Sequence, residues 1–216
     1  MIIQPKSKLL VIGDSITDCD RARPVGEGLF DALGKGYVSL VDGLLTARYP
    51  DHRIRMVNMG VSGNTVRDLH ARWQTDVLEL EPDWLSICIG INDVWRYFHS
   101  PNQSEWHVSL DEYAQTLDKL LQVTRPSLNG LILMTPYFIE PNRTEPMRKM
   151  MDQYGAAVRQ LAEKYQALFV DTQAAFDAAL TDLHPMALAW DRVHPTHAGH
   201  MILARSFLKA IEYEWQ

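Results

Sequence analysis

The sequence Leu-Val-Ile-Gly-Asp-Ser-Ile-Thr-Asp occupies residues 10–18 and begins as an apolar run that breaks at Gly13. Such a run is typical of a buried strand, and Ser15 follows its end. Far downstream, Asp191-Arg-Val-His194 places a carboxylate and an imidazole three residues apart. A serine at a strand end and a close Asp/His pair are the groups that nucleophilic acyl transfer requires.

Short apolar runs alternate with helical patterns along the rest of the chain. The runs lie at about 8–13, 53–58, 84–90, 130–135 and 167–171 and predict buried parallel strands. Between them, apolar residues recur at spacings of three and four, as in the stripe of Val66, Leu69, Trp73, Val77 and Leu80. This alternation predicts an α/β fold, a three-layer sandwich with helices on both faces of a five-stranded parallel sheet.

Four polar or small residues follow the ends of predicted strands, namely Ser15, Gly63, Asn92 and Tyr137. Right-handed crossovers bring the carboxyl ends of parallel strands to one edge of the sheet, where ligands of open α/β sheets bind. We therefore expect these residues to converge. The longest stretches without a clear pattern, 16–36 and 94–109, are expected to be irregular and to flank the pocket.

Ser15, His194 and Asp191 are the candidate catalytic residues. A serine hydroxyl is a poor nucleophile until a base removes its proton, and a neutral imidazole such as that of His194 can take and return that proton. Asp191 would then accept from the other ring nitrogen. The alternative is that Ser15 and Asp191 cap helices and that His194 is a surface residue without a catalytic role. The ordered set, flanked by Gly and Asn motifs, favours the catalytic interpretation.

Four longer stretches carry a resemblance to a known family. They are GDSITDCDRARP from Gly13, SGNTVRDL from Ser62, GINDVWR from Gly90 and AWDRVHP from Ala189. In order and spacing these stretches resemble the SGNH hydrolases, the GDSL esterase family, over nearly the whole chain. The Ser, Gly, Asn and His that name this family match Ser15, Gly63, Asn92 and His194.

The resemblance implies a flavodoxin-like sheet with strand order 2-1-3-4-5. It also implies an oxyanion hole made by the backbone N–H groups of Ser15 and Gly63 and the side-chain amide of Asn92. The residue types suit this role, because Gly63 lets a ligand approach the backbone and Asn92 donates without adding charge. Within the family, the stretches most resemble intracellular acetylxylan esterases. The implied activity is removal of acetyl groups from xylo-oligosaccharides or related sugar esters through an acyl-enzyme, with no cofactor.

Other functions fit parts of the pattern. A general short-chain carboxylesterase, a lysophospholipase or a thioesterase would use the same catalytic groups. A sugar-binding module without catalysis would keep the fold and the aromatic residues, but all three triad residue types and Asn92 are present. His194, His197 and His200 stand at three-residue spacing. No second carboxylate or cysteine completes a recognisable metal-ligand pattern, so no metal site is predicted.

Two acidic residues and several aromatic residues adjoin the motifs. Asp14 is expected to orient the turn or cap the segment after it, and Asp93 is expected to hold the Asn92 loop. The aromatic residues expected to contact substrate are Trp95, Tyr97, Tyr137 and Trp190. Flat aromatic faces suit the apolar faces of sugar rings. The alternative is that these rings wall the pocket or pack loops or a subunit contact.

Bulk composition narrows the class of partner. The chain has 216 residues, which predicts a single domain over 1–216, and 46% hydrophobic residues. A net charge of −6 argues against nucleic-acid and anionic-membrane partners. The N-terminal residues run straight into the strand before Ser15, and Cys19 and Cys88 form no disulfide framework, so a cytoplasmic location is expected.

The chain is also expected to form a homo-oligomer. Its last residues, Glu-Tyr-Glu-Trp-Gln at 212–216, hold two large aromatic side chains that a short tail can hardly bury alone. Tyr and Trp are enriched at interfaces because they bury much area at a low cost in entropy. The alternative is that this segment folds back on its own domain. Trp190 is expected near the same kind of contact.

Overall fold

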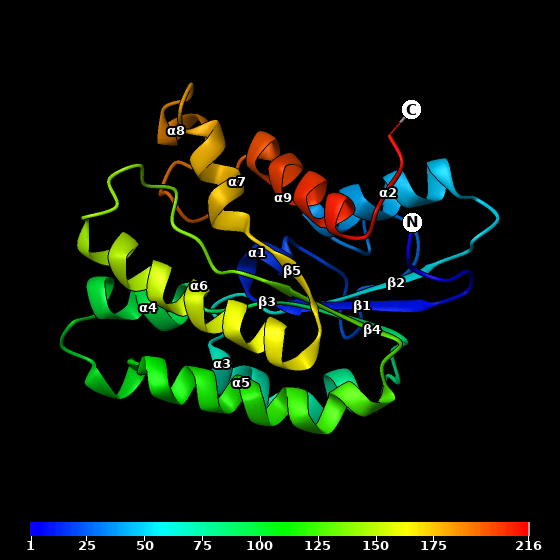
Figure 1. Cartoon of the computed structure of the whole chain (residues 1–216), viewed down its shortest axis with the longest axis horizontal. Coiled ribbons are helices and arrows are strands. Elements are labelled where there is room, and N and C mark those ends of the chain that lie inside the picture. The colour runs from blue at the N-terminus through cyan, green and yellow to red at the C-terminus, as the bar shows by residue number, and fades with distance from the viewer. Residues whose placement is uncertain (216) are drawn as a thin grey trace.

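A computed structural model describes residues 1–215, and it contains one five-stranded parallel sheet (Figure 1). The strands are β1 Lys8–Gly13, β2 Arg55–Gly60, β3 Trp84–Cys88, β4 Gly130–Met134 and β5 Leu168–Val170. Their order is β2-β1-β3-β4-β5, and every neighbouring pair is parallel. The predicted α/β class and the strand order 2-1-3-4-5 are both confirmed.

Helices cover both faces of this sheet (Figure 1). On one face α2 Tyr37–Arg48 packs against α9 His197–Ala210, which also contacts α7 Thr172–Ala179 and the short α8 Pro185–Leu188. On the other face lie α3 Val66–Trp73, α4 Ile91–His99, α5 Leu110–Thr124 and α6 Pro146–Tyr165. A one-turn helix, α1 Ser15–Asp18, follows β1 directly. Short π and 3₁₀ turns at Gln74–Leu78, Ser104–Trp106 and Arg125–Ser127 complete the elements.

Side-chain caps start the helices that border the strand ends. The Asp14 carboxylate accepts from the backbone N–H of Ile16 at the start of α1. Thr65 and Asp68 form a capping box at the start of α3, and the Thr196 side chain caps α9. Such caps satisfy helix N–H groups that have no partner within the helix, and each stabilises a helix by about 1 kcal/mol.

The core lies between the sheet and its helices. The side chains of β1, β3 and β4 are almost entirely buried, as their continuous apolar sequences predict. The packing leaves no room for a side chain at Gly130, where a Cβ atom would lie 2.2 Å from the Trp84 ring on the neighbouring strand. Among residues 1–215, no helix is both long and apolar enough to cross a membrane.

Several predicted boundaries differ from the structure, among them the end of the third strand, which lies at 88 rather than 90. The second strand spans 55–60 rather than 53–58, because Arg53 has a φ of 49° in the preceding turn and pairing starts at Lys8 with Arg55. The expectation that 94–109 is irregular is wrong for its first part, since α4 continues to His99. In α4 the buried Ile91 and Val94 lie on one helical face, and the aromatic residues after them obscured that period.

Candidate active site

The turn after β1 presents Ser15 at the carboxyl edge of the sheet. β1 ends at Gly13, Asp14 caps the next helix, and Ser15 is the first residue of α1. Cys19 ends this single turn in the left-handed conformation, with φ 41°. The Ser15 hydroxyl therefore sits on a short, well-anchored helix start and is partly open to solvent.

The loop before α9 carries the Asp/His pair. Asp191 Oδ1 accepts from the backbone N–H groups of Val193 and His194, at 2.9 and 2.8 Å. Asp191 Oδ2 lies 2.6 Å from His194 Nδ1. Between them, Arg192 has a φ of 64°. Its guanidinium donates to Glu140 at 2.6 Å, and its carbonyl accepts from Ile139 N–H, so the loop is tied to the segment after β4.

The three predicted triad side chains come together across this edge. Ser15 Oγ lies 2.9 Å from His194 Nε2, and the opposite ring nitrogen faces Asp191. Burial acts to raise the pKa of Asp191, but hydrogen bonds from His194 and the loop N–H groups outweigh it, and the pKa is lowered. The carboxylate is therefore ionised near neutral pH. It accepts from Nδ1–H and leaves Nε2 free to take the serine proton.

Potential donors for a developing oxyanion surround Ser15. Gly63 lies in the turn after β2, where Asn64 N–H donates to Val61 carbonyl and Gly63 has a φ of 80°. This geometry matches a type II turn, which favours glycine at that position. Asn92 is in the first turn of α4, and its Nδ2 donates to Asn64 carbonyl at 2.9 Å. An amide nitrogen carries two hydrogens, so a second donor remains for a ligand.

Two buried carboxyl groups lie behind these donors. Asp14 Oδ1 accepts a hydrogen bond from Ile16 N–H, as its predicted capping role requires. Asp93 Oδ1 accepts from Val66 N–H at 3.0 Å and so links the Asn92 turn to the start of α3. Burial raises the pKa of each group to about 7, and the proximity of Asp93 adds to the rise at Asp14. Both carboxyls are therefore substantially protonated near neutral pH.

The four predicted substrate-contact aromatics lie in different environments. The Trp95 ring packs edge-on against His194, with centroids 5.8 Å apart, and thus borders the triad. Trp190 is 79% exposed beside Asp191. Tyr97 stacks on His107 at 4.3 Å. The expectation for Tyr137 does not fit the structure, because its side chain is fully buried against Phe176. A residue type and its place after a strand cannot reveal such burial.

The other histidines of the 194–200 segment have different surroundings. His197 is exposed at the start of α9. His200 is buried, its Nδ1 accepts from Tyr37 N–H at 3.2 Å, and its Nε2 lies 3.3 Å from Cys19 Sγ. Burial lowers the pKa of His200 to about 4, so this imidazole is neutral. Its role is to pack α9 against the turns around Ser15 and Tyr37.

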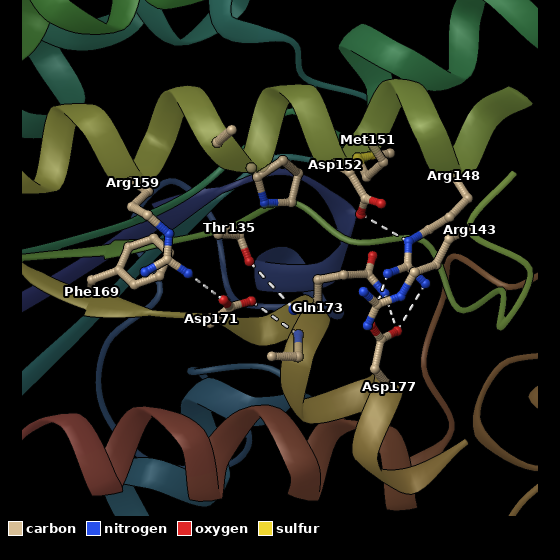
Figure 2. A pocket seen from close by; sticks show the side chains of 14 residues that line it. Thr135, Arg143, Arg148, Met151, Asp152, Arg159, Phe169, Asp171, Gln173 and Asp177 are labelled. Atoms are coloured by element: carbon tan, nitrogen blue, oxygen red, sulfur yellow. Dashed lines mark hydrogen bonds and ion pairs between the residues drawn. The ribbon is translucent and has the colours of Figure 1, made fainter. Parts of the chain in front are cut away.

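A separate pocket of about 250 Å³ lies between α6, α7 and the ends of β4 and β5 (Figure 2). Its charged side chains neutralise one another. Arg148 pairs with Asp177 and Asp152, and Arg159 donates to Asp171 at 2.7 Å. Arg148 Nη1 also donates to Glu140 carbonyl, in the segment that holds Arg192. These bonds tie α6 and α7 to the loop of the Asp/His pair, which is a structural role.

Sequence reasoning missed Arg72, which joins the strand ends beneath the site. Its guanidinium donates to the carbonyls of Gly13 and Met59, at 3.0 and 2.7 Å, and to Asn64 Oδ1 at 2.7 Å. One side chain therefore holds the ends of β1 and β2 and the Gly63 turn in register. The helical pattern of α3 gives no sign of this role, because an arginine beside an apolar stripe is usually a solvated residue.

Comparisons with known proteins agree with this architecture. Residues 11–202 match the model of the GDSL-like lipase/acylhydrolase family. An acetylxylan esterase from Geobacillus stearothermophilus is 62% identical over 215 residues, which cover 100% of this chain and 98% of that protein. The crystal structure of that organism's acetylxylan esterase Axe2 superposes with a TM-score of 0.99, at 62% identity and with 100% and 98% of the two chains covered.

Two further findings concern solved structures. Axe2 has also been crystallised as the catalytic mutants S15A, D191A and H194A. LAE5, an α/β hydrolase enzyme from the metagenome of Lake Arreo in Spain, is 52% identical, with a TM-score of 0.98 and full coverage of both chains. This chain is therefore similar throughout its length to solved hydrolases.

Proposed function

Because the chain belongs to the GDSL-like lipase/acylhydrolase family, we propose that it is a serine esterase that removes acetyl groups from O-acetylated xylo-oligosaccharides or related sugar esters. The observation that carries this proposal is the Ser15–His194–Asp191 chain, with its contacts of 2.9 and 2.6 Å. The similarity to an acetylxylan esterase over the whole chain supports the choice of substrate.

The reaction proceeds through an acyl-enzyme. Ser15 Oγ attacks the acetyl carbonyl carbon while His194 Nε2 takes its proton, and Asp191 stabilises the imidazolium. The backbone N–H groups of Ser15 and Gly63 and the Asn92 amide hold the oxyanion. The tetrahedral intermediate collapses, and the sugar hydroxyl leaves with the proton from His194. Water then attacks the acetyl-serine by the same steps and releases acetate. No cofactor takes part in this scheme.

The sugar is recognised at the open rim of the site. Trp95 walls the triad and Trp190 presents an exposed ring beside Asp191, which suits stacking on a pyranose face. Tyr97 lies further along α4 and stacks on His107 instead. Tyr137 does not reach this rim, because its side chain is buried.

Acetate release from a panel of acetyl esters tests the proposal. Acetylated xylo-oligosaccharides are expected to give a higher kcat/KM than acetyl-CoA and lysophospholipids, and acetyl esters a higher one than octanoyl esters. Ser15→Ala is the matched control and is expected to abolish release on every substrate, because the triad acts as a unit. A higher kcat/KM on long acyl chains or acyl-CoA would overturn the sugar-ester assignment.

The proposed enzyme is a cytoplasmic homo-oligomer. Cys19 and Cys88 are both free thiols, which suits a reducing compartment. Trp215 and Phe30 are 53% and 97% exposed, and such large apolar side chains are typical of subunit contacts. Tyr213 instead packs against Tyr49 of its own chain, and Gln216 lies outside the described residues. Light scattering tests the assembly, and a stable mass near 24.7 kDa would overturn it.

A further inference from the structure

Within itself, the turn that carries the Gly63 N–H is closed by one backbone bond, from Asn64 N–H to Val61 carbonyl. Gly63 has no side chain, and a Cβ placed there would meet no atom within 4 Å. Glycine is also the residue with the most backbone freedom. Within residues 1–215, neither Ser15 N–H nor Gly63 N–H donates to an acceptor of the chain. The distance between these two donors therefore depends on contacts made by neighbouring residues.

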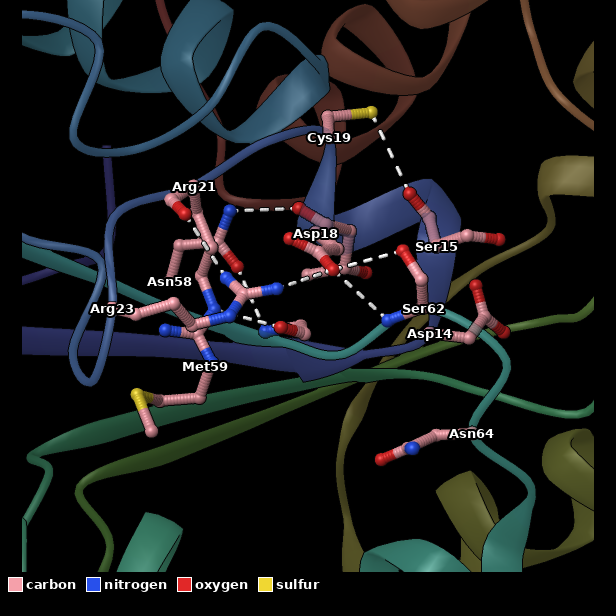
Figure 3. Close-up of polar contacts among 12 residues, drawn as sticks. Asp14, Ser15, Asp18, Cys19, Arg21, Arg23, Asn58, Met59, Ser62 and Asn64 are labelled. Carbon is pink, nitrogen blue, oxygen red and sulfur yellow. Dashed lines mark hydrogen bonds and ion pairs between the residues drawn. The ribbon is translucent and has the colours of Figure 1, made fainter.

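Asp18 links the two donor-bearing turns (Figure 3). It lies three residues after Ser15 in α1, and its Oδ2 accepts from both the backbone N–H and the hydroxyl of Ser62, each at 2.9 Å. Ser62 immediately precedes Gly63. The close approach of α1 to β2 makes this possible, because a Cβ at Gly60 would lie only 2.3 Å from Asp18 N.

The other side of the Gly63 turn is held by α4. Arg96 donates to Gly63 carbonyl at 2.8 Å, one helical turn after Asn92. The peptide group that carries Gly63 N–H thus lies between two anchored peptide groups. Asp18 holds the group before it, through Ser62 N–H, and Arg96 holds the group after it. The three elements that carry the potential oxyanion donors are joined at this turn.

The Asp18 carboxyl is a charged acceptor. Its side chain is 4% exposed, and burial acts to raise its pKa, but hydrogen bonds from Arg23 and Ser62 outweigh burial and lower the pKa. Arg23 donates to the same Oδ2 at 2.6 Å. Hydrogen bonds to an ionised acceptor are about twice as strong as neutral ones. The link between α1 and Ser62 is therefore much firmer than a contact between neutral side chains.

We propose that Asp18 is a positioning residue that sets the Gly63 N–H relative to the Ser15 N–H, so that both donate to one oxyanion. This inference rests on the proposed function, because it assigns the two amides to the same hole. Asp18 acts through Ser62 and touches neither the substrate nor the reacting atoms. Its effect is on the transition state, where the negative oxygen develops, rather than on substrate binding.

Asp18→Asn in the full-length protein tests the proposal with 4-nitrophenyl acetate as substrate. The side chain keeps its shape but loses its charge. We expect kcat to fall about 10–100-fold with KM within about twofold, less than the loss for a deleted donor because the amide is displaced rather than removed. Hydrogen–deuterium exchange of the segment 59–65 is expected to accelerate. Asp20→Asn, an exposed change two residues away, is expected to leave kcat and exchange unchanged.

Ser62→Ala is the second variant and removes one of the two bonds to Asp18. A loss in kcat of about 3–10-fold, again without a change in KM, is expected. If Asp18→Asn fails to fold, Ser62→Ala alone decides the test. Wild-type kcat in Ser62→Ala, or in a folded Asp18→Asn, would overturn the proposal. The exchange and aryl-acetate measurements use no sugar. If the enzyme does not hydrolyse acetylated xylosides, the proposed substrate is therefore wrong, but the test of Asp18 remains valid.

Discussion

Replacing Asp191 by Asn is expected to harm catalysis more than replacing it by Ala. In the wild type, Asp191 Oδ2 faces His194 Nδ1 at 2.6 Å, so the ring carries its proton on Nδ1 and accepts from Ser15 through Nε2. An Asn oxygen can still accept from the N–H groups of Val193 and His194, which keeps the loop folded. Its NH₂ group then faces Nδ1 and favours the tautomer in which Nε2 cannot take a proton.

The magnitude follows from the exposure of the pair. A carboxylate and an imidazolium about 4 Å apart attract by about 4 kcal/mol at an effective dielectric of about 20. The two side chains are 37% and 46% exposed, and solvent screening reduces this attraction to about 2–3 kcal/mol. Either substitution loses that term, which is about 10²-fold in kcat. In Asp191→Asn the wrong tautomer adds a further cost of about one net hydrogen bond, which lowers kcat roughly tenfold more.

Steady-state hydrolysis of 4-nitrophenyl acetate by both variants checks the order. The expected kcat values are about 10²-fold below wild type for Asp191→Ala and about 10³-fold below for Asp191→Asn, with thermal unfolding as the control for folding. Asp191→Asn activity equal to or above that of Asp191→Ala would refute the tautomer argument. A kcat within threefold of wild type in either variant would remove Asp191 from the mechanism.

Three further outcomes are expected. Asn92→Ala should lower kcat by roughly 10²–10³-fold with little change in KM, and an unchanged kcat would remove Asn92 from the oxyanion hole. Burial raises the Asp93 pKa to about 7, so the folded state holds a proton that the unfolded chain loses near pH 4, and stability falls between these values as pH rises. The free energy of unfolding of Asp93→Asn, measured in urea, should therefore rise by about 2 kcal/mol relative to that of the wild type between pH 5 and 8. A difference between the two proteins that does not change with pH would contradict this. Gly130→Ala should destabilise by about 1–3 kcal/mol in urea, because its Cβ meets the Trp84 ring, and an unchanged midpoint would show that the ring can move.

Local pattern determined the architecture of this protein. Continuous apolar runs predicted the five strands, and their alternation with helical stripes predicted the layers, because a buried parallel strand and an amphipathic helix each have a period visible within a short window. Topology then brought Ser15, Gly63 and Asn92 to one edge of the sheet. The Asp191–His194 spacing in sequence marked the partner loop, and the structure brings its imidazole to 2.9 Å from Ser15 Oγ.

Only the tertiary structure decided what surrounds these groups. The sequence predicts substrate contact equally for Tyr137 and Trp190, yet the Tyr137 side chain is fully buried and Trp190 is 79% exposed. Asp18, Arg72 and Arg96 read as ordinary charged residues, but each donates to or accepts from the Gly63 turn or a residue beside it. Burial and hydrogen-bond partners are set by chain segments far apart in sequence, and the period of a single helix or strand carries no information about them.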